Sequence, residues 1–143
     1  MNFLIEYAMK FVGLPYLYGG SNALTGFDCS GLVQEILKMA GICPVVRLNS
    51  RQLYSTFKTA GQVGVFGPGA LCFYGTSEEY IDHVAFMITD KLCIEAGHGD
   101  QTVINKEIAA KRGAVVHVRP YEKHGKFFQV IMPNYPDWLL KNG

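Results

Sequence analysis

A cysteine and a distant histidine are the residues of this chain best suited to chemistry. Cys29 lies in the run Asp28–Val33 (DCSGLV), which opens a predicted helix, and His83 opens an apolar run much later in the chain. A thiol attacks as the thiolate, so it needs a base that takes its proton. A histidine suits this task because its ordinary pKa lies near neutrality. The pair therefore predicts nucleophilic catalysis through a thiol.

The position of Cys29 in its helix favours an anion. Asp28 is a natural N-cap, so Cys29 falls in the first turn, where free N–H groups and the helix dipole stabilise negative charge. We expect the pKa of the thiol to lie below its ordinary value of about 8.5. The N–H of Cys29 or of its neighbour could also donate to a developing oxyanion. The competing interpretation is an inert buried thiol, against which the polar neighbours Asp28 and Ser30 argue.

Two kinds of periodicity divide the chain. Apolar residues recur at helical spacing in two early segments, residues 2–12 and 28–40, and we expect a short helix within residues 47–59, for which Ser50 is a suitable start. Short apolar runs bounded by Gly, Pro or Asp-Lys turns follow and predict strands, at residues 70–74, 84–88, 92–94, 114–118 and 127–131. We expect the tail, residues 133–138, to be irregular. Helices followed by strands predict an α+β fold with an antiparallel sheet.

Length and charge limit the function classes. The 143 residues suit one domain, residues 1–143, and carry a formal net charge of +1. No basic field therefore exists to hold nucleic acid or an anionic membrane. The apolar stretches are far shorter than the roughly 20 residues that span a bilayer, and residues 1–14 lack the pattern of a signal peptide. We expect a soluble protein, made in the cytoplasm, with no nucleic-acid or membrane partner.

The other cysteines and histidines have ordinary structural explanations. No CxxC or HxxxH spacing occurs among the four cysteines and four histidines, so we expect no metal and no cofactor. Cys43, Cys72 and Cys93 are expected to be core thiols. His117 lies within an apolar strand and His124 in a polar loop, and neither is expected to be catalytic.

Successive motifs resemble those of the NlpC/P60 family of cysteine peptidases, over about residues 3–97. The matching segments are Pro15–Gly20, Gly26–Val33, Arg47 with Ser50–Gln52, Pro68–Phe73 and Asp82–Met87. The resemblance implies a papain-like α+β fold with N-terminal helices packed on an antiparallel sheet. It also implies a hydrolase of peptidoglycan stem peptides, acting through a thiol acyl-enzyme on the bond between γ-linked D-glutamate and a diamino acid.

The resemblance further implies individual roles. Cys29 is the nucleophile, His83 is the general base, and the Tyr16 hydroxyl helps to hold the oxyanion. Asp28 and Ser30 match positions beside the nucleophile that contribute to the substrate pocket. The order of Cys before His argues against the circularly permuted acyl transferases related to this family.

The third catalytic position is the main departure from the family pattern. A polar residue, most often His, follows the base by about twelve positions there, and Glu95 occupies that place, with His98 as its rival. A three-residue connection between the two strands would set Ala85 opposite Glu95, on the face of His83. A two-residue Asp90–Lys91 turn would favour His98, but it lacks the usual glycine. We therefore favour Glu95, whose carboxylate would stabilise an imidazolium.

A second function class stays open. The same sequence could form a catalytically silent or structural module of a phage tail or assembly, an idea that Glu95 in place of the usual partner motivates. For an active enzyme without a wall-binding repeat, we expect delivery to the cell wall by a phage or a secretion machine. Trimming of recycled muropeptides in the cytosol is the other setting.

Overall fold

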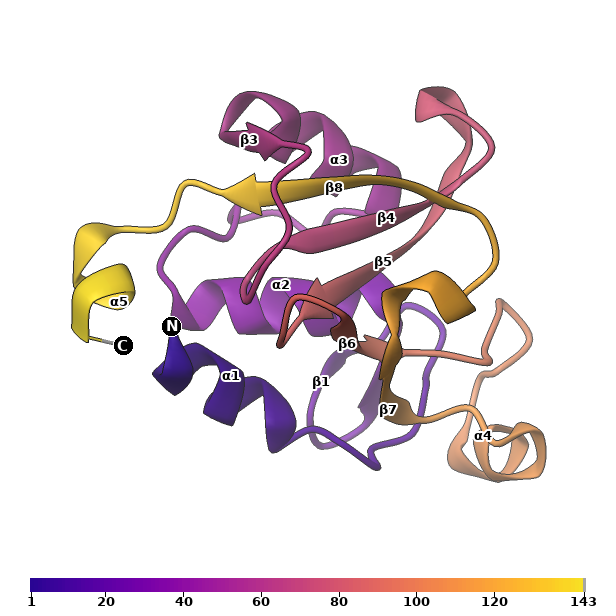
Figure 1. The fold of residues 1–143 in the computed structure, drawn as a ribbon. Coiled ribbons are helices and arrows are strands. Elements are labelled where there is room, and N and C mark those ends of the chain that lie inside the picture. The colour runs from indigo at the N-terminus through magenta and orange to yellow at the C-terminus, as the bar shows by residue number, and fades with distance from the viewer. Residues whose placement is uncertain (143) are drawn as a thin grey trace.

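A computed structural model describes residues 1–142 of the chain, and within them six strands form one sheet (Figure 1). The strand order is β3-β8-β4-β5-β6-β7, and every neighbouring pair is antiparallel. The strands are β3 (Gly61–Val63), β4 (Leu71–Gly75), β5 (Ile81–Met87), β6 (Leu92–Ala96), β7 (Val116–Pro120) and β8 (Phe127–Pro133). The expected antiparallel sheet is confirmed.

Three N-terminal helices, α1 (Asn2–Met9), α2 (Cys29–Met39) and α3 (Ser50–Thr59), contribute to the main hydrophobic core with one face of this sheet. α2 contacts β5 and β6, and α3 contacts β3, β5 and β8. The core has members from all three helices and from alternate strand positions, among them Leu4, Leu32, Ile36, Leu53, Phe57, Phe73, Val84, Phe86 and Ile94. The α+β class with helices packed on a sheet is thus confirmed.

A smaller core lies on the opposite face of the sheet. Its members alternate along the strands with those of the main core: Ala70, Cys72, Tyr74, Ala85, Met87, Cys93 and Val130. Because residues two apart in a strand share a face, His83 lies on the same side as Ala85, and Glu95 on the same side as Cys93. Both residues are thus presented on the face that carries this smaller core.

The start of α2 is fixed by its cap and by a close backbone contact. The Asp28 carboxylate accepts a hydrogen bond from the N–H of Gly31 at 2.7 Å, which confirms the predicted N-cap. A Cβ at Gly31 would lie 1.9 Å from the carbonyl oxygen of Gly20. Glycine is needed at position 31 because the loop before α2 packs directly onto the first turn. That loop contains the short hairpin of β1 (Ser21–Asn22) and β2 (Gly26–Phe27).

The tail differs from the expected irregular segment. Residues 134–136 are irregular, but α5 (Asp137–Asn142) begins at Asp137. Leu139 is fully buried, and its carbonyl accepts a hydrogen bond from the Met1 ammonium group at 2.5 Å. The helix forms because Leu139 completes the core beside α1. The N-terminus and α5 therefore lie on the same side of the molecule (Figure 1).

The helix α4 (Lys106–Arg112) was not predicted. Only Ala109 among its seven residues is fully buried, so it leaves almost no apolar periodicity. Its ends are set instead by the Asn105 cap and by Gly113, which has a φ of 64°. Two 3-10 turns, η1 (Glu78–Tyr80) and η2 (Tyr121–Lys123), complete the described elements. The longest helix in residues 1–142, α2, has 11 residues, and none of the described helices could cross a bilayer.

Candidate active site

A cavity of about 460 Å³ brings the predicted nucleophile and base together. Cys29, from the first turn of α2, and His83, from β5, both line it, as does Tyr16 from the preceding loop. Gly97 and His98 also line this cavity. Residues separated by more than 50 positions in the sequence thus share one cavity because α2 packs against β5 and β6.

Cys29 is half-buried, and its thiol lies beside the backbone N–H groups of Val84 and Ser30. Burial and the negative charge of Asp28 raise the pKa of the Cys29 thiol to about 12. The two N–H groups and Arg47 lower this pKa, but only in part. The expectation of a lowered pKa is therefore wrong: loss of solvation outweighs the helix N-terminus. The resting thiol is protonated, so it would need a base to remove its proton before it could act as a nucleophile.

His83 is suited to be that base because it is neutral at rest. Its side chain is only 6% exposed, and burial lowers the pKa of the imidazole. Glu95 raises this pKa, while the charges of His124 and Arg119 lower it further. Nε2 of His83 lies 3.5 Å from Oε2 of Glu95. This leaves Nδ1 as the ring nitrogen available to the Cys29 thiol.

The β5–β6 hairpin decides which residue faces His83. Phe86 lies opposite Ile94 and Met87 opposite Cys93, which is the register predicted from a three-residue connection. One step further along this register, Glu95 faces Ala85, so it lies on the same side of the sheet as His83, and its carboxylate is almost fully buried. His98 is exposed on the cavity rim with a φ of 60°. The structure thus brings Glu95, and not His98, against His83.

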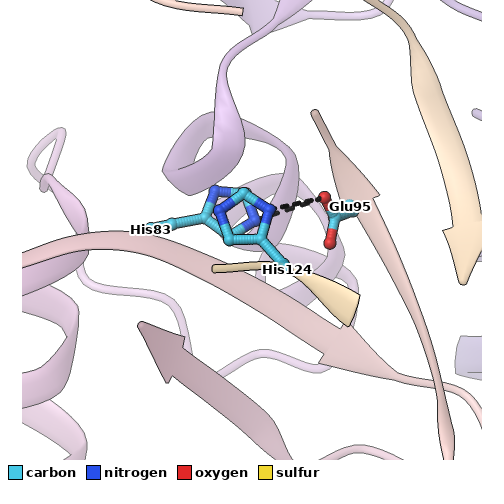
Figure 2. A group of neighbouring side chains, drawn as sticks. All are labelled: His83, Glu95 and His124. Atoms are coloured by element: carbon cyan, nitrogen blue, oxygen red, sulfur yellow. Dashed lines mark ion pairs between the residues drawn. The ribbon is translucent and has the colours of Figure 1, made fainter. Parts of the chain in front are cut away.

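Glu95 also contacts three basic side chains that the sequence did not place in the site: His117 and His124, which were given ordinary structural explanations, and Arg119. Arg119 binds both carboxylate oxygens, with Nε 3.1 Å from Oε1 and Nη2 3.0 Å from Oε2. His117 Nε2 lies 3.4 Å from Oε2. His124 Nδ1 lies 3.3 Å from the same oxygen (Figure 2). Burial opposes ionisation of Glu95, but His124, His83 and Arg119 hold the pKa of its carboxyl far below the usual range.

Part of this cluster left a signal in the sequence. In β7, His117 and Arg119 alternate with Val116 and Val118, and His117 lies directly opposite Glu95 in the β6–β7 ladder. Polar residues alternating with valines predict a strand with one polar face, which could have placed both near Glu95. His124 follows η2 in a loop, where no periodicity fixes its direction.

The rings of His83 and His124 lie flat on each other. Their centroids are 3.7 Å apart and their planes differ by 11° (Figure 2). The Tyr74 ring packs against both imidazoles, with its centroid 5.3 Å from that of His83 and 4.9 Å from that of His124. The β5 imidazole is therefore held between aromatic neighbours and one carboxylate.

The same three residues offer nitrogen and oxygen atoms within 4.8 Å of one another, close enough to suggest a metal site. The lone pair of an imidazole nitrogen lies in the ring plane, and these two planes are stacked rather than convergent. A single ion could not lie in both planes, and Arg119 already binds Glu95. The described arrangement of His83, Glu95 and His124 thus fits a tetrahedral zinc ion poorly.

Tyr16 lies on the wall of the cavity that holds Cys29, and it is largely buried. A Cβ at Gly99 would lie 2.2 Å from the Tyr16 ring, so a glycine is required where the two touch. Burial and the nearby Cys29 raise the pKa of the Tyr16 hydroxyl. The hydroxyl therefore stays protonated and can donate a hydrogen bond.

Asp28 and Ser30 line a neighbouring hollow of about 370 Å³ rather than the cavity of Cys29 itself. Arg47 forms an ion pair with Asp28 and donates to Ser30 Oγ at 2.9 Å. Tyr18 lines both hollows, so they adjoin at that residue. The two predicted substrate-binding residues are thus engaged with Arg47 beside the nucleophile.

Comparison with known proteins agrees with the sequence motifs. A sequence model of the NlpC/P60 family matches residues 13–129, and the chain belongs to this family. A bifunctional muramidase/DL-endopeptidase, CwlT, of Bacillus subtilis (strain 168) is 39% identical over 87 residues. That match covers 59% of this chain and 26% of CwlT, so the chain spans about a quarter of that relative.

Solved structures share the fold. The NlpC/p60 domain of the peptidoglycan hydrolase SagA superposes with a TM-score of 0.63 at 22% identity, covering 90% of this chain and 94% of that domain. RipD from Mycobacterium tuberculosis, described as a non-catalytic NlpC/p60 domain protein adapted to peptidoglycan binding, gives 0.64 at 23% identity, covering 92% and 94%. The fold thus occurs both in a hydrolase and in a non-catalytic protein.

Proposed function

We propose that this chain is a cysteine peptidase that hydrolyses peptidoglycan stem peptides at the bond between γ-linked D-glutamate and a diamino acid. The observation that carries the proposal is the cavity shared by Cys29, His83 and Tyr16, with Glu95 behind the imidazole. Membership of the NlpC/P60 family and the DL-endopeptidase relative support the substrate class.

The first half of the reaction forms an acyl-enzyme. Nδ1 of His83 takes the proton of the Cys29 thiol as the sulfur attacks the carbonyl carbon of the scissile amide. The oxyanion accepts hydrogen bonds from the Tyr16 hydroxyl and from N–H groups of the first turn of α2. The C–N bond then breaks, and His83 returns the proton to the leaving amine.

The second half releases the acyl product. A water molecule gives a proton to His83 and attacks the thioester carbonyl. The C–S bond breaks, the product leaves as a carboxylic acid, and the proton on His83 returns to the thiol. Glu95 orients the imidazole and balances its charge while it is protonated.

Mass spectrometry of muropeptides after incubation with the protein tests this function. The parent protein and Cys43→Ala should cut the γ-D-glutamyl bond, whereas Cys29→Ala should show no cleavage above background. Cys43 is a matched control because its thiol is also half-buried but lies outside the cavity of Cys29. Cleavage by Cys29→Ala at the parental rate would show that the mechanism is wrong.

A catalytically silent module is the second candidate. The likeness to RipD supports it. The two hydrogen bonds from Arg119 to Glu95 also support it, because they weaken the stabilisation that the carboxylate can provide to a protonated His83. Alkylation with iodoacetamide separates the two. In an active enzyme Cys29 should react faster than Cys43, and His83→Ala should remove this difference. Equal and slow alkylation of both thiols in the parent protein would favour the silent module.

Delivery to the cell wall by a phage or a secretion machine stays a prediction of the sequence. If the protein is delivered to the cell wall, it should cleave intact sacculi in preference to soluble stem-peptide fragments. Activity confined to fragments with a free N-terminus would favour the recycling of muropeptides instead.

A further inference from the structure

We propose that His124 is a positioning residue of the active site: its ring, stacked on His83 and joined to the same carboxylate oxygen, fixes the plane in which His83 presents Nδ1 to Cys29. The proposal rests on the proposed hydrolase function and assigns a role to a loop residue outside the predicted triad. Figure 2 shows both rings directed at Glu95, His83 from β5 and His124 from the segment before β8.

Glu95 alone does not fix the His83 ring. The 3.5 Å between Nε2 and Oε2 is long for a hydrogen bond, and Nε2 has no hydrogen-bond partner within the described residues. The flat contact with His124, at 3.7 Å between centroids, covers a whole face of the ring. Rotation of His83 about its Cβ–Cγ bond would have to displace His124. The stack therefore constrains the orientation more than the carboxylate does.

His124 is itself held from three sides. Its Nδ1 lies 3.3 Å from Glu95 Oε2 and contacts the guanidinium of Arg119, and its ring meets that of Tyr74 at 4.9 Å and 61°. The Tyr74 hydroxyl also donates to the carbonyl of Tyr121 at 2.7 Å, which ties the η2 turn to β4. The loop that carries His124 is thereby anchored to the sheet at two points.

The stack also affects the protonation of His83. The titratable or charged groups around that ring are Glu95 from β6, His117 and Arg119 from β7, Tyr74 from β4, Cys29 from α2 and His124 itself. Two protonated imidazoles in flat contact would repel each other, so a proton on His124 opposes one on His83. Arg119 acts in the same direction, and Glu95 in the opposite one. His124 thus favours the unprotonated base that the thiol needs.

NMR of the histidine Cε1–H groups tests the proposal without any substrate. His124→Phe keeps a flat ring but has no ring nitrogen, His124→Ala has neither, and Lys123→Ala changes an exposed neighbour in the same segment. The His83 signal should carry a ring-current shift in the parent, in His124→Phe and in Lys123→Ala, and should lose it in His124→Ala. The His83 titration midpoint should rise by about one pH unit in both His124 variants, but not in Lys123→Ala.

Kinetics on a stem peptide provides the second readout. In His124→Ala, kcat should fall roughly tenfold with little change in KM, because the base loses its orientation. In His124→Phe, kcat at alkaline pH should approach that of the parent protein. The acid limb of its kcat/KM profile should shift to higher pH, by the same amount as the His83 titration midpoint. A parental His83 signal and midpoint in His124→Phe and His124→Ala would overturn the proposal.

The two proposals fail separately. If the parent protein cleaves no stem peptide but the His83 signals change as described, the hydrolase function is wrong, while the constraint that His124 places on the His83 ring stands. If the parent cleaves and both His124 variants match it in kcat, acid limb and His83 titration, the positioning role is wrong and the function stands.

Discussion

Glu95 carries one negative charge and contacts four basic side chains. His83 contacts Oε2 alone, whereas Arg119 binds both oxygens, and the carboxylate is 1% exposed. A buried charge that loses its partner is costly, so Glu95 and Arg119 depend on each other for stability. The stabilisation that we expected Glu95 to give an imidazolium at His83 is therefore shared with Arg119.

Substitution of Glu95 should affect stability and activity to different extents. Glu95→Leu should lower the free energy of unfolding by about 3–5 kcal/mol, because Arg119 is left partly buried without its counter-charge, and it should remove most activity. Glu95→Gln keeps a side-chain oxygen that can accept hydrogen bonds from Arg119 and His83, so it should retain part of the stability and part of the activity. Urea denaturation and stem-peptide cleavage measure the two effects.

A double variant separates the two roles of Glu95. Glu95→Leu combined with Arg119→Met should regain most of the stability lost in Glu95→Leu, since no unpaired charge remains, but it should not regain activity. Full activity of Glu95→Leu, with a large loss in His98→Ala, would reverse the assignment in favour of His98.

At the scale of elements, the first turn of α2 is where loop and helix must fit. Alanine is a better helix former than glycine by about 1 kcal/mol, so Gly31→Ala would stabilise an isolated helix. Here the new Cβ would meet the carbonyl oxygen of Gly20. We expect Gly31→Ala to lower the free energy of unfolding by about 1–3 kcal/mol and to reduce cleavage, because Cys29 lies two residues away.

Thermal denaturation and cleavage assays check this prediction, with Lys38→Ala as the control at an exposed position of the same helix. The control should change the stability by no more than about 0.5 kcal/mol. A Gly31→Ala protein at least as stable as the parent would mean that the contact between the loop and the helix is not tight.

The sequence predicted the elements whose residues face a core. α2 was expected with nearly its observed bounds because its apolar residues repeat at helical spacing and Asp28 caps its start, and α3 was expected within residues 47–59. α4 buries a single side chain completely, and β3 has only three residues at the edge of the sheet, so neither produces a pattern. The two elements that were missed, α4 and β3, are stabilised by caps and tertiary contacts, which leave no repeating pattern of apolar residues in the sequence.

For the site, hairpin geometry was the useful guide. The β5–β6 register follows from the length of the connection and places Glu95 near His83 without any knowledge of the fold. The effect of burial on Cys29 could not be predicted, because it depends on what packs around the first turn of α2. The place of His124 depends on the path of a loop, which a local pattern does not determine.

For the whole molecule, the buried cluster predicts a loss of stability in acid. The pKa values of His83 and His117 are lowered from 6.5, and the pKa of Glu95 is lowered from 4.5. As the pH falls below about 6.5, the unfolded chain binds protons on both histidines that the folded protein does not. Below about 4.5, Glu95 adds to the effect in the same direction.

Urea denaturation at pH 8, 6 and 4 should therefore show stability falling at each step. Each group contributes at most about 1.4 kcal/mol for each unit of its pKa shift. In the double variant Glu95→Leu with Arg119→Met, the additional fall in stability below about pH 4.5 should be absent, because this fall comes from protonation of Glu95. A stability maximum near pH 5 would contradict the prediction.

The strand order has a consequence for synthesis on the ribosome. β8, the last strand, lies between β3 and β4 and pairs with both. Until residues 127–133 have emerged, β3 and β4 each keep an open edge that can pair with another nascent chain. Every residue of the proposed site, from Tyr16 to His124, is translated before this strand. The catalytic groups are therefore made first, but the sheet that holds them closes only when β8 leaves the exit tunnel.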